Sequence, residues 1–208
     1  MMAVVSGAKE EFSGLTLFKG LDAKTRGRLA GGVTCLTVPR GYVLFREGDR
    51  CTGLHVVIHG QIKLVLRAGK GHDKVFDVIG ADTSFGESAL LLDLPHQVTA
   101  EAIIESQLVL LSRTTLLREI TANGEFAMRV IRGLAQQSRR RTHDLKSYVL
   151  FSGTQRVISH LLHEIPDENG ASGEVEVTLS TRKGIIASKL NLTQEHFSRI
   201  LHDLTSAA

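Results

Sequence analysis

Residues Glu125–Leu150 read EFAMRVIRGLAQQSRRRTHDLKSYVL, and this stretch predicts one uninterrupted helix. Asn123 precedes it as a favourable N-cap residue, and Glu125 places a negative charge in the first turn, where the helix dipole favours it. At a rise of about 1.5 Å per residue the helix would be about 39 Å long, which exceeds most helices of globular proteins. The remaining sequence divides into the parts before and after this helix.

One stripe of the helix advances by alternating steps of three and four residues, the spacing that keeps one face turned toward a partner helix. The stripe contains Ala127, Val130, Leu134, Ser138, Arg141, Leu145 and Tyr148. It is apolar at both ends and polar at its middle. Two interpretations follow, which are a dimer seam and a long amphipathic helix that packs on its own domain.

Before the helix, seven short runs rich in β-branched and aromatic residues alternate with glycine-containing turns, and each run predicts a strand. The runs are Val33–Val38, Tyr42–Arg46, Leu54–His59, Ile62–Arg67, Lys74–Ile79, Val98–Ile104 and Leu108–Ser112. Such closely spaced strands are typical of a small antiparallel sandwich or barrel, and not of alternating β-α units. Short helical regions are expected on either side, at Leu15–Leu29 and Thr114–Ile120.

The segment after the long helix changes its pattern twice. Thr154–Ile165 carries a helical apolar stripe, which Pro166 closes because proline cannot continue a helix. Glu174–Leu179 then alternates apolar and polar residues, as a short hairpin strand does.

Two short helical patterns follow close together, at Arg182–Leu190 and Thr193–Leu204. Only Asn191 and Leu192 separate them, and asparagine tolerates the left-handed backbone conformation of a tight turn. A helix, a tight turn and a second helix of this length have the geometry of a DNA-reading helix-turn-helix.

The composition is that of an ordinary globular protein, with 208 residues, 42% hydrophobic and 23% charged. No apolar run approaches the ~20 residues that span a bilayer, so we expect a cytoplasmic location and no membrane partner. The formal net charge of +3 falls entirely in residues 113–208, which is compatible with nucleic-acid binding.

Cys35 and Cys51 are too few to hold an iron-sulfur cluster. No catalytic motif is present, so an enzyme is not predicted.

Four strings, in this order, resemble the Crp/Fnr superfamily of bacterial transcription regulators over nearly the whole chain. They are PRGYVLFREGD at 39–49, GQIKL at 60–64, FGESAL at 85–90 and LTQEHFSRIL at 192–201. The resemblance implies an α+β fold: an N-terminal antiparallel β-roll of the cyclic-nucleotide-binding type at 1–120, a dimerisation helix at 121–151 and a winged-type helix-turn-helix at 152–208. It favours a parallel dimer seam for the long helix. It also implies a homodimer that binds double-stranded DNA and RNA polymerase.

The second helix of the motif divides into an exposed and a buried face. Thr193 is expected to cap it, while Gln194, Glu195, Ser198 and Arg199 form the exposed face. Arg199 offers a donor fork for guanine O6 and N7, and Glu195 accepts from a cytosine amino group. The string Glu195-x-x-Ser198-Arg199 resembles the Fnr-type recognition pattern, which implies an inverted repeat of TTGAT-like half-sites. The alternative is an intrahelical ion pair between Glu195 and Arg199.

Cations and the end of the chain complete the DNA-binding prediction. Arg182, Lys183 and Lys189, with Thr193, are candidate phosphate contacts, although each lysine or arginine is otherwise a solvated surface charge. The sequence stops at Ala208, directly after the second helix. Most of the β-hairpin wing is therefore expected to be absent, which would weaken DNA binding through fewer phosphate contacts.

The resemblance also defines an effector pocket, formed by Gly86, Glu87, Ser88, His96, Gln97 and Val98. In superfamily members that bind cyclic AMP, a Gly-Glu pair is followed by Arg-Ser, and the arginine neutralises the cyclic phosphate. Gly86 and Glu87 are present here, but Gln97 and Val98 stand where Arg-Ser would fall. A neutral amide does not replace a guanidinium on a phosphate, and valine has no hydroxyl, so cyclic AMP is not the expected effector.

The strings LDLPHQVTA at 92–100 and SQL at 106–108 resemble the Dnr-type nitric-oxide-responsive regulators, which implies haem in the β-domain. His55, His59, His72 and His96 are the candidate haem ligands, and each is otherwise a surface or packing histidine. The alternatives are a regulator that senses another small molecule or a cyclic nucleotide, and a ligand-sensing dimer that binds DNA weakly or not at all.

Overall fold

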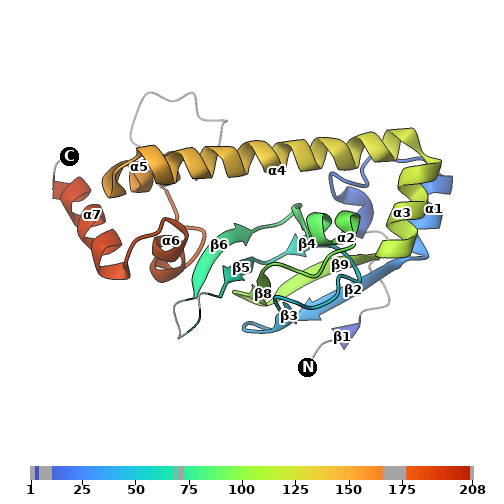
Figure 1. Cartoon of the computed structure of the whole chain (residues 1–208), viewed down its shortest axis with the longest axis horizontal. Helices are drawn as coiled ribbons and strands as arrows, with labels where there is room; N and C mark the ends of the chain where they lie inside the picture. The colour runs from blue at the N-terminus through green and yellow to red at the C-terminus, as the bar shows by residue number, and fades with distance from the viewer. Residues whose placement is uncertain (1–2, 5–10, 68, 70–72, 166–176, 207–208) are drawn as a thin grey trace. The chain divides into compact units, whose positions relative to one another are not determined.

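The computed structural model describes residues 3–4, 11–67, 69, 73–165 and 177–206. The chain divides into two compact units, Met1–Gln137 and Ser138–Ala208. The boundary lies inside the long helix α4 (Gly124–Leu150), which matches the predicted helix and contributes to both units (Figure 1). Within the described ranges, no helix has both the length and the apolar character that a bilayer crossing requires.

The N-terminal unit contains two antiparallel sheets (Figure 1). The five-stranded sheet has the order β1-β2-β9-β4-β7, and the four-stranded sheet has the order β3-β8-β5-β6. The strands are β1 (Ala3–Val4), β2 (Val33–Val38), β3 (Val43–Phe45), β4 (Gly53–His59), β5 (Ile62–Leu66), β6 (Lys74–Ile79), β7 (Ser84–Phe85), β8 (Thr99–Ala102) and β9 (Ser106–Ser112). All seven predicted strands are confirmed, whereas β1 and β7 were not predicted.

Both faces of the five-stranded sheet are covered, which explains why β4 is buried along most of its length. Leu54 and Val56 of β4 face a cluster formed with the helices, while Val57 faces a second cluster shared with the four-stranded sheet. Successive side chains of a strand point to opposite faces, so an apolar run is required where neither face meets water. Leu108 and Val109 of β9 divide between the two clusters in the same way.

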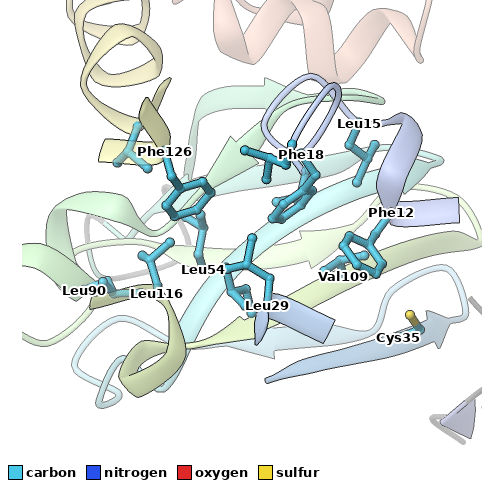
Figure 2. Close-up of a cluster of buried hydrophobic side chains, with 14 of the residues drawn as sticks. Phe12, Leu15, Phe18, Leu29, Cys35, Leu54, Leu90, Val109, Leu116 and Phe126 are labelled. Carbon is cyan, nitrogen blue, oxygen red and sulfur yellow. The ribbon is translucent and has the colours of Figure 1, made fainter. Parts of the chain in front are cut away.

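Helices of the N-terminal unit pack on one face of this sheet. They are the 3-10 helix η1 (Glu11–Gly14), α1 (Ala23–Ala30), α2 (Glu87–Leu92), α3 (Arg113–Ala122) and the first part of α4. Figure 2 shows Leu29 of α1, Leu116 of α3 and Phe126 of α4 gathered around Leu54 of the sheet. This cluster fixes the start of the long helix against the β-domain.

The predicted helical region at Leu15–Leu29 is correct only in its second half, because α1 begins at Ala23. Asp22 sets that start, since its side chain accepts hydrogen bonds from the backbone N–H groups of Lys24 and Thr25 at 2.9 and 3.0 Å. Before it the chain forms turns, in which Phe18 is nevertheless fully buried. The predicted Asn123 cap is confirmed, because its Oδ1 accepts from the N–H groups of residues 125 and 126.

The C-terminal unit contains the end of α4 and three further helices. They are α5 (Gly153–His163), α6 (Lys183–Lys189) and α7 (Gln194–Ser206). Val157, Ile186, Leu190, Phe197 and Ile200 form its small core with neighbouring residues. The predicted strand at Glu174–Leu179 lies partly outside the described residues, and residues 177–179, which are described, do not form a strand.

Candidate functional site

The helix-turn-helix geometry predicted from the sequence is present in α6, the turn and α7. Asn191 adopts the left-handed conformation with φ of 54°, as expected for the tight turn. The N–H of Leu192 donates to the carbonyl of Ala187 at 2.8 Å, which closes the turn against the end of α6. Phe197 and Ile200 are buried below the turn, so α7 has a fixed inner face.

The outer face of α7 carries the predicted DNA-reading residues. Gln194, Glu195, Ser198 and Arg199 are all exposed. The hydroxyl of Thr193 accepts a hydrogen bond from the N–H of residue 196 at 3.2 Å, as predicted for the N-cap. Within the described part of the chain, Glu195 and Arg199 form no ion pair with each other or with any other residue. Both side chains are therefore available to a ligand on this face.

The candidate phosphate contacts differ in their accessibility. Arg182 and Lys183 are exposed at the start of α6, where the helix dipole also favours a negative ligand. Lys189 is half-buried at the end of α6, and its carbonyl accepts a hydrogen bond from the hydroxyl of Tyr148 in α4. The start of α6 is therefore the more accessible cationic position.

Of the predicted effector residues, Gly86, Glu87 and Ser88 lie at the corner between β7 and α2, and His96, Gln97 and Val98 lie between α2 and β8. Gly86 has a φ of +97°, a conformation that favours glycine, and it allows α2 to begin directly after the strand. Glu87 is buried, and its carboxylate accepts a hydrogen bond from the side chain of Gln137 in α4 at 2.8 Å. Ser88 and Gln97 are exposed, while Val98 packs against the core between the two sheets.

His55 and His96 lie together in a buried aromatic cluster with Phe45 and Phe85. The rings of Phe45 and His96 stack with centroids 3.5 Å apart, and those of His55 and Phe85 stack with centroids 5.0 Å apart. Phe45 also contacts His55, with a centroid separation of 5.4 Å. Of the other two candidate haem ligands, His59 is exposed at the end of β4, and His72 lies outside the described residues.

Both clustered imidazoles are held in the neutral form. Burial, with a smaller contribution from the nearby His96, lowers the pKa of His55 from its usual 6.5 to about 3. Burial also lowers the pKa of His96, although the carboxylate of Asp49 opposes that effect. The Nδ1 atom of His55 is buried and has no hydrogen-bond partner among the described residues. The rings of Phe45 and Phe85 cover this imidazole, so a ligand reaches the nitrogen only if they separate.

The predicted stripe of α4 is wrong at its N-terminal end as a dimer seam. Val130 is 6% exposed and belongs to the core beneath the helices, and Leu134 packs against the same core. A neighbouring stripe of α4, which shares Ser138 and Leu145 with the predicted one, is exposed at every position and has the same three-four spacing. This outward stripe consists of Met128, Ile131, Ala135, Ser138, Thr142, Leu145 and Val149.

Sequence reasoning missed Phe45, Phe85 and Gln137, which contact residues of the candidate effector site. Phe45 ends an apolar run and Phe85 stands alone between Ser84 and Gly86, and neither position carries a local signal that places its ring beside a histidine. Gln137 lies one turn after Leu134 on the inward side of α4, so its position on that side was visible in the sequence. Its partner Glu87 was not, because the contact joins distant segments.

Residues 35–123 match a family model described as the cyclic nucleotide-binding domain. The two sheets, the β7–α2 corner and the following helices agree with that class of ligand-binding domain. Gln97 and Val98, which precede β8, stand in place of the expected arginine and serine, so the chain departs here from members that bind a cyclic phosphate.

The chain as a whole has transcription regulators among its relatives. A CRP-like cAMP-activated global transcriptional regulator of Mycobacterium tuberculosis is 25% identical over 189 residues, which cover 90% of this chain and 84% of that protein. The structure of FixK2 from Bradyrhizobium japonicum is similar with a TM-score of 0.73 and 19% identity, over 84% of this chain and 85% of that chain. The structure of DNR from Pseudomonas aeruginosa is similar with a TM-score of 0.55 and 25% identity, over 98% and 89%. Over most of its length the chain is therefore similar to regulators of the Crp/Fnr type, as its four sequence strings indicated.

Proposed function

We propose that this protein is a DNA-binding transcription regulator that acts as a homodimer and responds to an effector in its β-domain. The observation that carries the proposal is the outer face of α7, where four polar side chains are exposed on a capped helix with a buried inner face. The similarity to a global transcriptional regulator of Mycobacterium tuberculosis supports the same function.

On DNA, α7 enters the major groove and Arg199 donates two hydrogen bonds to a guanine. Glu195 accepts from a cytosine amino group, while Gln194 and Ser198 contact neighbouring base edges. The target is an inverted repeat of TTGAT-like half-sites, because a two-fold dimer places its two reading helices in major grooves about 34 Å apart. Arg182, Lys183, Thr193 and the less accessible Lys189 position the unit on phosphates.

The dimer forms through the outward stripe of α4, whose members are exposed and follow the spacing of a coiled-coil seam. Ile131, Leu145 and Val149 supply most of its apolar area, with 53%, 61% and 71% of each residue exposed in the single chain. Burying these side chains against a second copy removes apolar surface from water. RNA polymerase is the further partner of such a dimer on a promoter.

A DNA titration tests base reading. Two DNAs are compared by fluorescence anisotropy: a TTGAT inverted repeat, and the same repeat with another base in place of its guanine. Arg199→Ala should reduce the difference in binding free energy between them by about 1 to 3 kcal/mol. Arg182→Ala is the matched control, because it should weaken binding to both DNAs equally and reduce the salt dependence. Equal weakening of both DNAs by Arg199→Ala would refute base reading. A wild-type protein that binds neither DNA would favour a ligand-sensing dimer instead.

For the effector, we propose haem as the cofactor and nitric oxide as the signal. The donor chemistry of the buried cluster fits haem, because His55 is a neutral imidazole with an unpartnered nitrogen in apolar surroundings. His55 would be the iron ligand, with His96 beside it, and the bound iron would supply the centre that reacts with nitric oxide. Phe45 and Phe85 now pack on these rings, so entry of a planar group requires the rings to separate.

Haem titration of the purified protein tests this proposal. The Soret band should shift on binding and shift again with nitric oxide, and His55→Ala should remove both changes. His59→Ala is the control, because His59 lies exposed on the same strand. An unshifted Soret band in the wild-type protein would exclude haem. Binding of cyclic AMP in a parallel calorimetric titration would instead support a cyclic nucleotide as the effector.

A further inference from the structure

The carboxylate of Glu87 is held by the long helix. The Nε2 atom of Gln137 donates to Oε1 of Glu87 at 2.8 Å and to the backbone carbonyl of Ser84 at 3.1 Å. Ser84 belongs to β7 and Glu87 begins α2, with Phe85 and Gly86 between them. A single amide group of α4 therefore contacts both ends of the β7–α2 corner.

Gln137 occupies a defined place on α4. Phe126, Val130 and Leu134 precede it on the inward side of the helix, and all three contact the core beneath the helices. Gln137 continues this side by one turn but brings an amide in place of an apolar group. It is also the last residue of the N-terminal unit, so the Gln137–Glu87 contact lies where α4 leaves the β-domain.

The contact has an energetic consequence because Glu87 is 6% exposed. A buried carboxylate that loses a hydrogen-bond donor is destabilised unless another donor replaces it. If α4 moves away from the corner, Glu87 loses the amide of Gln137. A ligand whose hydroxyl or amino groups donate to Glu87 supplies the replacement, so binding of such a ligand and release of Gln137 favour each other.

We propose that Gln137 is the positioning residue that couples the β7–α2 corner to α4. This proposal rests on the function proposed above. With the Gln137–Glu87 contact formed, α4 is fixed to the β-domain up to residue 137. When an effector takes the place of the Gln137 amide on Glu87, the turn of α4 that ends at residue 137 is released from the β-domain. The outward stripe on the same helix then presents a less ordered surface to the second copy, which weakens dimerisation and DNA binding.

Gln137→Glu tests the contact, because it places a second carboxylate beside Glu87. Amide hydrogen exchange in residues 131–138 should become at least about tenfold faster, which is the exchange equivalent of losing about 1.4 kcal/mol of local stability. Gln136→Glu is the matched control, since it adds the same charge at the adjacent exposed position. The double variant Glu87→Gln with Gln137→Glu restores an amide–carboxylate pair in reverse and should restore protection.

A second variant, Gln137→Leu, removes the amide without adding charge and should also accelerate exchange. DNA titration should show at least about threefold weaker binding for Gln137→Glu than for Gln136→Glu. Equal exchange in these two variants would overturn the contact as a constraint on α4. Faster exchange with unchanged DNA affinity would overturn the coupling. Exchange is measured without DNA, so a wild-type protein that binds no DNA would refute the proposed function while the exchange comparison still decides the role of Gln137.

Discussion

His55 shows how one strand position sets the chemistry of a side chain. The alternation along β4 sends Leu54 and Val56 toward the helices and His55 toward the rings of Phe45 and Phe85. An imidazole in such surroundings is stable only in its neutral form, since a buried charge without a partner is strongly disfavoured. His55 is thus a weak base on the inside of a stable sheet.

The pH dependence of folding should report this state. The pKa of His55 is lowered to about 3 in the folded chain, from 6.5 when the side chain is exposed. The contribution of this neutral histidine to the free energy of unfolding is therefore fully present above about pH 6.5. It is lost as the pH falls from about 6.5 toward 3, by up to about 1.4 kcal/mol per pH unit. Urea unfolding of wild type and His55→Gln at pH 7, 6 and 5 measures the difference, because the variant should have the shallower slope.

The control for this slope is His59→Gln, which changes an exposed histidine of the same strand. It should retain the wild-type pH dependence. His96 and His160, whose pKa values are also lowered by burial, contribute to the dependence that remains in every variant. An identical slope in wild type and His55→Gln would show that His55 is not held neutral.

At the scale of single residues, the sequence identified the histidines but not their grouping. His55 was predicted in a strand and His96 at a corner, and both are correct. Their common environment depends on the pairing of His55 with Phe85, which lies in a two-residue strand without periodicity. By contrast, Thr193 and Asn191 were predicted correctly, because capping and left-handed turn conformations depend on local sequence alone.

Among the elements, α4 combines an apolar outward stripe with a cationic border. If Met128 is assigned to position a of a heptad, Arg132, Arg139 and Lys146 occupy the e positions and Arg141 occupies a g position. In a parallel pair, Arg141 of one chain then lies opposite Lys146 of the other. The apolar seam favours the dimer, while these like charges oppose it.

We therefore expect the dimer to become tighter as salt increases, because ions screen the repulsion between exposed charges. Lys146→Glu should strengthen the dimer by about 1 kcal/mol in total, since it converts two symmetric repulsions into attractions of a few tenths each. Sedimentation equilibrium at low and high salt measures both effects. Arg140→Glu, which makes the same charge change outside the seam, should have a smaller effect. A dimer that weakens with salt would contradict this arrangement.

Element boundaries were predicted well where composition changes sharply. The strands from β2 to β6 are β-branched runs ended by glycine or charged turns, and their bounds agree closely with the structure. The stripe of α4 was assigned to the wrong side at its start because the helix is apolar on two sides. Periodicity alone does not distinguish the side that Val130 buries in its own domain from the side that Ile131 exposes.

At the scale of the whole molecule, the cores of the two units have no residue in common. The N-terminal unit has one cluster under its helices and another between its sheets, and the C-terminal unit has its own cluster around Phe197. Helix α4 is the element that both units contain. Each unit therefore has an independent source of stability.

Phe197→Ala should destabilise the C-terminal unit by about 3 to 5 kcal/mol, because it leaves a cavity at a fully buried site. Hydrogen exchange should then show lost protection in α5, α6 and α7, while β4 and β9 keep theirs. Phe18→Ala is the reciprocal control, since Phe18 is equally buried in the cluster under the helices. Loss of protection in both units from either substitution would show that they unfold as one.

The position of β9 in the five-stranded sheet has a consequence for synthesis of the chain. It pairs with β2 on one side and β4 on the other, yet it is the last of these strands to be translated. Until β9 leaves the ribosome, β1 and β2 are separated from β4 and β7 by a missing central strand. The nascent chain must therefore expose unpaired strand edges until Ser112 has emerged, which is the interval in which chaperones would protect it from aggregation.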